Sequence, residues 1–214
     1  MPAFLRYSFG TAVSPAKRLA ELAADERRVV HAAEAVIFAG LLYAVVSVAL
    51  AAAGAVPLAP VFLDIQVDNY YVWQAVFSLP FVLLNWILAG GLLHVLSRSK
   101  MVTGTFEDSL AASGAAVSAS LVIAWVPLAI IAVFMVLGMR QEELVGILSP
   151  PGFWQTVDIA WYIIAGLSAP GFMALATVKA HRTHKPHAPK PLRAAAVGLV
   201  AGAVLVGAFV IFMR

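Results

Sequence analysis

The sequence predicts an all-α membrane protein, a polytopic bundle of five transmembrane helices. Of its 214 residues, 62% are hydrophobic and 12% are charged, and the mean hydropathy is +0.92. Soluble globular domains have about 45–50% apolar and about 25% charged residues. Five stretches reach the roughly 20 apolar residues that a helix needs to cross a hydrocarbon core of about 30 Å. None of the five alternates in polarity as the strands of a membrane β-barrel do.

The expected spans cover residues 32–56, 73–96, 110–137, 157–178 and 194–212. A cleaved signal peptide has an apolar region of about 7–15 residues, and the first span is longer and follows a polar, basic segment. We therefore expect the first span to be retained. The expected domains are an amphipathic leader over residues 1–31 and a transmembrane domain over residues 32–214.

Lys and Arg residues fall mainly on one side of the expected membrane. Five precede the first span, two lie between the second and third, and five lie between the fourth and fifth, against Arg140 and Arg214 on the other side. Cytoplasmic loops collect Lys and Arg, so we expect a cytoplasmic N-terminus and an external C-terminus. Aromatic residues on the external side are typical of an interfacial belt: Tyr70, Tyr71, Trp73, Phe153, Trp154, Trp161 and Tyr162.

The leader contains a helix-start signal at Ser14 and Pro15, since a Ser side chain caps free N–H groups and Pro is pre-set for the first turn. From there to Val30, apolar residues share one face and charged residues oppose them. We expect a short amphipathic helix on the cytoplasmic membrane surface. The alternative is a solvated leader of mixed charge.

The second span carries a polar stripe. Gln74, Ser78 and Asn85 lie within about 40° of one another on a helix, and Asn85 falls near the bilayer midplane. Such groups face protein or water, so the stripe indicates either a hydrogen bond between helices or a polar path for a substrate or ion.

The third span begins with a capping-box-like signal, in which Thr105 caps the helix and Glu107 and Asp108 lie in its first turn. Small residues then share one face, as is typical of close helix packing: Ser109, Ser113, Ala116 and Ser120.

Prolines interrupt three spans, at Pro80, Pro127 and Pro170. The helices are expected to bend there, either around a cavity or as a feature of packing alone. In the fifth span, Ala194, Gly198 and Gly202 form a small-residue run at four-residue spacing. This run indicates either a dimer interface or packing within the bundle.

A basic segment joins the fourth and fifth spans and contains no acidic residue. We expect its cations to contact anionic lipid headgroups: Lys179, Arg182, Lys185, Lys190 and Arg193. His181, His184 and His187 share this segment, but Pro186 and Pro189 break helical geometry and the cations repel a divalent ion. We therefore expect neither a metal nor another cofactor.

Enzyme motifs are missing from the sequence. It has no cysteine, no serine-hydrolase or HExxH motif, and no glycine-rich nucleotide loop. No base is placed beside a nucleophile, so we expect no enzymatic activity and no catalytic residues. The expected partners are membrane lipids and either a second copy or other membrane proteins, with no nucleic acid.

The centre of the chain resembles a known family. Residues 86–96 read WILAGGLLHVL and residues 104–110 read GTFEDSL, followed by a helix of small residues. This pattern is similar to the bacterial branch of the Yip family, the Ypt-interacting proteins. The resemblance implies five spans, a cytoplasmic N-terminus, an inner-membrane location and a non-enzymatic function in membrane organisation or trafficking. The aspartate-leucine-tyrosine-glycine-proline motif of eukaryotic members is absent, so a small GTPase is not an expected partner.

The sequence therefore gives two functional hypotheses. The first is a Yip-like inner-membrane protein that acts through helix and lipid contacts. The second is a small transporter or channel subunit that uses the polar stripe of the second span.

Overall fold

The computed structural model describes residues 1–57, 66–98, 105–184 and 191–213, and within these ranges it contains helices but no strand. Five helices are long and apolar enough to cross a membrane. They are α4 (Arg28–Ala52), α5 (Tyr70–Arg98), α6 (Phe106–Val136), α8 (Phe153–His184) and α9 (Pro191–Met213). The predicted five-helix membrane bundle is therefore confirmed. α5, α6 and α8 continue through Pro80, Pro127 and Pro170.

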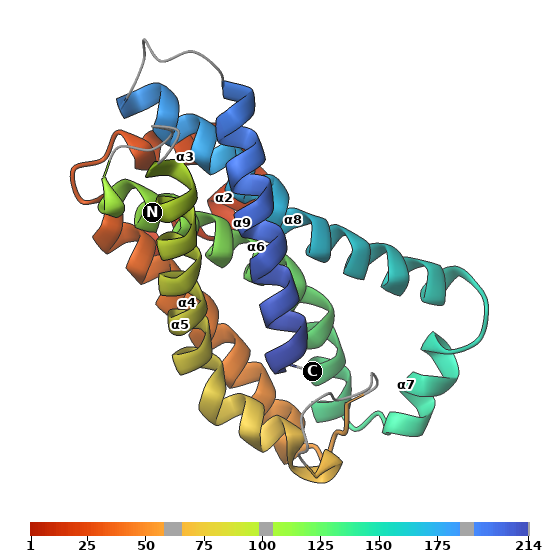
Figure 1. Cartoon of the computed structure of the whole chain (residues 1–214). Coiled ribbons are helices and arrows are strands. Elements are labelled where there is room, and N and C mark those ends of the chain that lie inside the picture. The colour runs from red at the N-terminus through yellow and green to blue at the C-terminus, as the bar shows by residue number, and fades with distance from the viewer. Residues whose placement is uncertain (58–65, 99–104, 185–190, 214) are drawn as a thin grey trace.

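The spans run alternately up and down (Figure 1). The starts of α4, α6 and α9 lie at one end of the bundle, together with the ends of α5 and α8. We call this the amino-terminal end. The other end, which we call the opposite end, carries α7 (Gln141–Leu148) and the last turns of α9. The first half of α8 diverges from the other spans (Figure 1), and α8 is the least buried of the five.

The first half of α6 lies at the centre of the fold. From Asp108 to Val122, every residue except Leu110 is buried, although burial on one face alone was expected. α4, α5, α8 and the leader all contact α6. Because nearly all of these residues are Ala, Ser, Gly or Val, neighbouring elements approach α6 closely from every side. The small residues therefore allow other elements to pack on all sides of α6, and not only along one face.

Three tryptophans join the spans by donating indole N–H groups to backbone carbonyls. Trp86 donates to Leu110 (2.8 Å), Trp125 to Leu42 (3.1 Å) and Trp161 to Ile123 (2.8 Å). The last bond follows from the sequence of α6, because Pro127 has no N–H to donate to the carbonyl four residues earlier, that of Ile123. Trp161 satisfies this carbonyl and thereby attaches α8 to α6.

The leader differs from the expected surface helix. It forms α1 (Ala3–Tyr7), α2 (Phe9–Val13) and α3 (Pro15–Ala23), and these pack against α4, α6 and α8. Tyr7, Leu19 and Leu22 belong to the same hydrophobic core as the spans. Phe4 and Phe9 contact Phe38, ten residues into α4. The apolar face of α3 therefore packs against protein, because the small side chains of α6 and α8 leave room for it.

The helix ends at Thr105, Gly54 and Gly138 follow local sequence signals, and the one at Ser14 does not. The capping box predicted at Thr105 is confirmed, with Asp108 as its partner. Gly54 and Gly138 have φ of 68° and 98° and end α4 and α6, positions that favour glycine. Ser14 makes no side-chain cap, in contrast to the expectation, because it also closes α2 and its backbone is held at φ −137°, ψ 63°.

The orientation of the bundle in the membrane gives a first prediction. A reporter fused after Gly54, or within residues 144–151, is expected to behave as external, and a reporter at Ser99 or Thr183 as cytoplasmic. The reason is the excess of Lys and Arg at the amino-terminal end. Paired phosphatase and fluorescent-protein fusions measure this. A cytoplasmic signal from residues 144–151 would contradict the expected orientation.

Candidate ligand cavity

A cavity of about 380 Å³ lies between the spans and reaches the opposite end of the bundle. It extends from residues 55–57 and Gln141 down to Asn85 and Val117. All five spans and α7 contribute to its wall. Most of the wall is apolar, and the polar side chains in it are those of Tyr43, Tyr70, Tyr71, Gln74, Asn85, Ser120, Gln141 and Tyr162.

The polar stripe predicted on the second span is divided by the structure. Gln74 and Asn85 line the cavity, whereas Ser78 is buried and donates to the carbonyl of Gln74 within α5. Gln74 also has partners in the protein: the Ser47 hydroxyl of α4 lies 2.9 Å from its Oε1, and its Nε2 lies 3.5 Å from the Tyr70 hydroxyl. Gln74 therefore helps to join α4 to α5 in the cavity wall.

Asn85 lies at the inner end of the cavity. It is 15 residues from the start of α5, about 22 Å along the helix axis, which places it near the middle of the span. Its exposed fraction is 6%. In the part of the chain that the structure describes, no hydrogen bond engages the carboxamide of Asn85. The cavity is the space that this polar group faces.

Two of the three span prolines act at the cavity wall. Pro127 is itself a lining residue, and the indole N–H of Trp161 donates to the Ile123 carbonyl that Pro127 leaves free. Pro170 cannot donate to the carbonyl of Gly166, another lining residue. Of these two carbonyls, that of Gly166 therefore belongs to a lining residue and lacks its usual helical donor, whereas that of Ile123 is bonded to Trp161.

The loops of the opposite end are fastened around the mouth of the cavity. Gln141 of α7 accepts from the backbone N–H of Val56 (2.8 Å) and donates to its carbonyl (3.0 Å). The hydrogen bonds that Arg140 donates hold the pKa of the exposed Glu143 carboxyl below its usual value.

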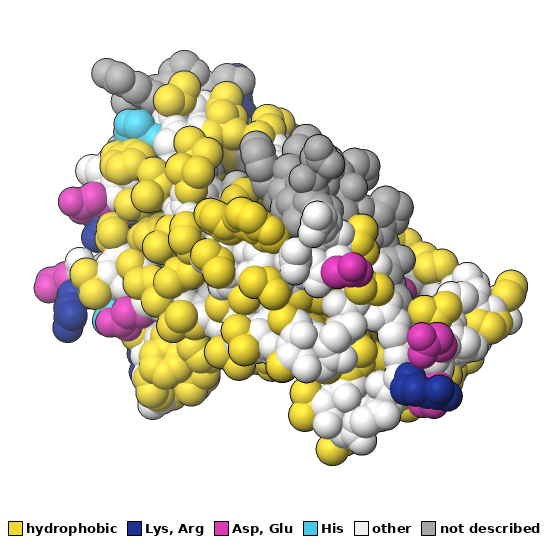
Figure 2. All heavy atoms as spheres, turned by 90° about the horizontal axis from the view of Figure 1, so that it is seen from below, with side chains coloured by type: hydrophobic (Ala, Val, Ile, Leu, Met, Phe, Trp, Pro, Cys, Tyr) yellow, Lys and Arg dark blue, Asp and Glu magenta, His cyan; other side chains and the backbone are white. Residues whose placement is uncertain are grey.

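Figure 2 views this end of the bundle. Hydrophobic side chains dominate it, and a group of charged side chains lies over α7 at its right edge.

Five of the seven aromatic residues expected as an interfacial belt form two groups. Trp73, Phe153 and Trp154 are exposed on the outside of the bundle, as a belt requires. Tyr70 and Tyr71 are buried and line the cavity. The buried position of Tyr70 and Tyr71 is not predictable from the sequence, because both groups occur near helix ends.

The small residues singled out in the sequence face other parts of the same chain. A Cβ atom on Gly198 would lie 2.5 Å from the Met173 carbonyl oxygen, and one on Gly202 would lie 2.5 Å from Pro170 Cα. In α6, Ser109 and Ser113 are buried against neighbouring helices, and Ser120 lines the cavity and donates to the Ala116 carbonyl.

The predicted lipid-contact residues are only partly described. Lys179 is half-buried on α8 and Arg193 is exposed in the first turn of α9. Arg182 lies in the last turns of α8. Lys185, Lys190 and His187 lie outside the described residues. Headgroup contact therefore stays a prediction.

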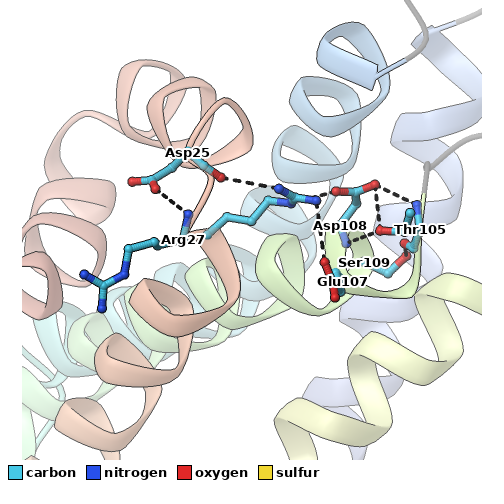
Figure 3. A network of polar contacts seen from close by, with 7 residues as sticks. Asp25, Arg27, Thr105, Glu107, Asp108 and Ser109 are labelled. Carbon is cyan, nitrogen blue, oxygen red and sulfur yellow. Dashed lines mark hydrogen bonds and ion pairs between the residues drawn. The ribbon is translucent and has the colours of Figure 1, made fainter.

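A second polar cluster fastens the amino-terminal end of the bundle (Figure 3). Arg28 Nε lies 2.7 Å from Asp108 Oδ1, and Arg28 Nη2 lies 3.8 Å from Glu107. The Asp108 side chain is 2% exposed and also accepts from the Thr105 backbone N–H (2.6 Å). Asp108 of the capping box therefore also joins α6 to α4 through Arg28. The residue spacing that predicts the capping box does not predict this ion pair.

The leader is attached to this cluster through Asp25. The Asp25 carboxylate accepts from the Tyr7 hydroxyl (3.3 Å) and the Arg27 backbone N–H (2.8 Å), and it lies 3.0 Å from His31 Nδ1. Burial opposes ionisation, but these hydrogen bonds hold the pKa of Asp25 below its usual value. Burial and the adjacent carboxylate raise the pKa of the Tyr7 phenol. Among the described residues, the space beside Arg28 and Asp108 measures about 10 Å³, so we assign the cluster a structural role.

Comparisons with known proteins found no matching family model, no similar curated protein and no similar solved structure. The resemblance to the Yip family therefore rests on residues 86–96 and 104–110 alone. It stays a prediction.

Proposed function

We propose that this protein binds a small, mainly apolar molecule in its central cavity, as the binding site of a membrane transporter does. The observation that carries the proposal is the cavity itself. Its volume of about 380 Å³ lies within the roughly 300–1,000 Å³ of small-molecule sites. Such sites combine a mainly apolar wall with a few converging polar groups, and this wall has that composition.

The lining also favours binding over chemistry. Among the described residues that line the cavity, none is Asp, Glu, Lys, Arg or His. Most general acids and bases in enzymes are side chains of these types. We therefore propose a non-enzymatic function, in a multi-pass protein of a bacterial inner membrane.

The membrane-organising function implied by the Yip resemblance stays a prediction from the sequence. The cavity favours the transporter hypothesis over it, because the predicted polar stripe of α5 supplies two lining residues, Gln74 and Asn85. A protein that acts only through outward-facing helix and lipid contacts has no need of such a wall.

Filling the cavity is expected to weaken binding. Ala165 lines the cavity, and Ala160 is exposed on the same helix. In lipid nanodiscs, a diazirine-bearing octanol is expected to label cavity peptides of the wild type and of Ala160→Trp, and to label those of Ala165→Trp about tenfold less. Mass spectrometry of the cross-linked peptides measures this. Labelling confined to the outer faces of the helices, or equal in the two variants, would contradict the proposal.

A further inference from the structure

The residue at the inner end of the cavity indicates what kind of molecule fits there. Asn85 is more than nine-tenths buried, it lines the cavity, and within the described residues no hydrogen bond satisfies its carboxamide. A polar group that is removed from water without gaining a hydrogen-bond partner is unfavourable. A ligand group that bonds to Asn85 removes this cost, so Asn85 favours ligands with a polar head over purely apolar ones.

The charge of the wall restricts that head. Among the described residues of the lining, no side chain is ionised at neutral pH, so none of them compensates a buried ligand charge. An uncompensated charge loses far more in desolvation than one hydrogen bond returns. A carboxylate, phosphate or ammonium head is therefore disfavoured at the inner end.

The hydrogen-bonding groups available there both donate and accept. A carboxamide offers two N–H donors and a carbonyl acceptor. Ser120, also in the wall, already uses its hydroxyl hydrogen on the Ala116 carbonyl (2.7 Å), so its oxygen is left to accept. The carbonyl of Gly166 lacks its usual helical donor because residue 170 is proline. A head that can donate as well as accept suits this set.

We propose that Asn85 selects an uncharged head group that both donates and accepts hydrogen bonds, such as a hydroxyl or an amide, on a mainly apolar molecule. This inference rests on the proposed function and names the substrate class of the same cavity. Asn85 acts as the specificity-determining residue, while the apolar wall holds the rest of the molecule without discriminating between chains.

Competition against the diazirine-bearing octanol tests the selection. The competitors are 1-octanol, octane and octanoate at pH 7, with concentrations expressed as mole fractions in the nanodisc bilayer. For the wild type, 1-octanol is expected to compete about tenfold better than octane, the ratio that one hydrogen bond of about 1–1.5 kcal/mol gives. Octanoate is expected to be weaker than 1-octanol by at least the same factor.

Asn85→Leu is expected to keep the label but to lose the preference for 1-octanol over octane. The matched control is Ser78→Ala, on the same face of α5 but outside the cavity lining, which is expected to keep the preference. A preference that survives in Asn85→Leu would overturn the inference while leaving the proposed function intact. Should Asn85→Leu not fold, the wild type still decides, because octanoate competing as well as 1-octanol overturns the inference. Absence of cavity labelling in the wild type would overturn both proposals.

Discussion

Gly202→Leu is expected to prevent α8 and α9 from packing and to destabilise the protein by about 3 kcal/mol or more. Even a Cβ atom at this position would lie 2.5 Å from Pro170 Cα and 3.0 Å from the Ala169 carbonyl oxygen. These are backbone atoms, which cannot turn aside as a flexible side chain does. The yield of monodisperse protein in detergent and the midpoint of denaturant unfolding, followed by tryptophan fluorescence, measure the effect.

Gly207→Leu is the matched control for this experiment. It lies on the same helix, and a Cβ atom there would meet no described atom within 4 Å. Its unfolding midpoint is expected to stay close to that of the wild type. If Gly202→Leu unfolded like Gly207→Leu and lost only a dimer, the small-residue run of α9 would be a dimer interface after all.

Asp108→Ala is expected to destabilise the protein by about 3 kcal/mol, because it leaves the guanidinium of Arg28, whose side chain is 19% exposed, without its closest partner. Part of this loss comes from the capping box, in which Asp108 accepts from the Thr105 backbone N–H. Asp108→Asn keeps an acceptor for that cap but removes the charge, so it is expected to fall between Asp108→Ala and the wild type. Denaturant unfolding in detergent micelles measures all three proteins.

Glu107→Ala controls for the loss of negative charge at the same helix start. The Glu107 side chain is 71% exposed and 3.8 Å from Arg28, so its removal is expected to cost no more than about 0.5 kcal/mol. The double variant Arg28→Met with Asp108→Leu is expected to recover part of the stability, since it leaves no unpaired buried charge. Equal losses of stability from Glu107→Ala and Asp108→Ala would show that the Arg28–Asp108 pair contributes no more than the exposed Arg28–Glu107 pair.

The polar stripe of α5 is the part of the candidate site that the sequence predicts in part. Helical periodicity placed Gln74, Ser78 and Asn85 on one face, but it did not distinguish the two residues that line the cavity from the one that bonds within its own helix. Tyr70 and Tyr71 were assigned to a membrane interface because aromatic residues at helix ends have that average preference. They are buried in a cluster with residues of α4, α6 and α7 that are distant along the chain: Val46, Leu50, Ala132, Met135 and Leu144.

The sequence by itself determined the features that depend on local chemistry. Hydropathy over about 20 residues predicts a spanning helix, since an unpaired backbone cannot stay in hydrocarbon, and Thr105 starts α6 through atoms three residues apart. Only the tertiary structure decided which surfaces meet. The sequence does not determine whether a small-residue face on α6 or α9 packs against the leader, another span or a second copy. The reason is that lipid and protein are similarly apolar, so burial alone does not favour one partner. The choice of the leader for α6 and of α8 for α9, and with it the cavity that remains between the spans, comes from the shapes of all the helices together.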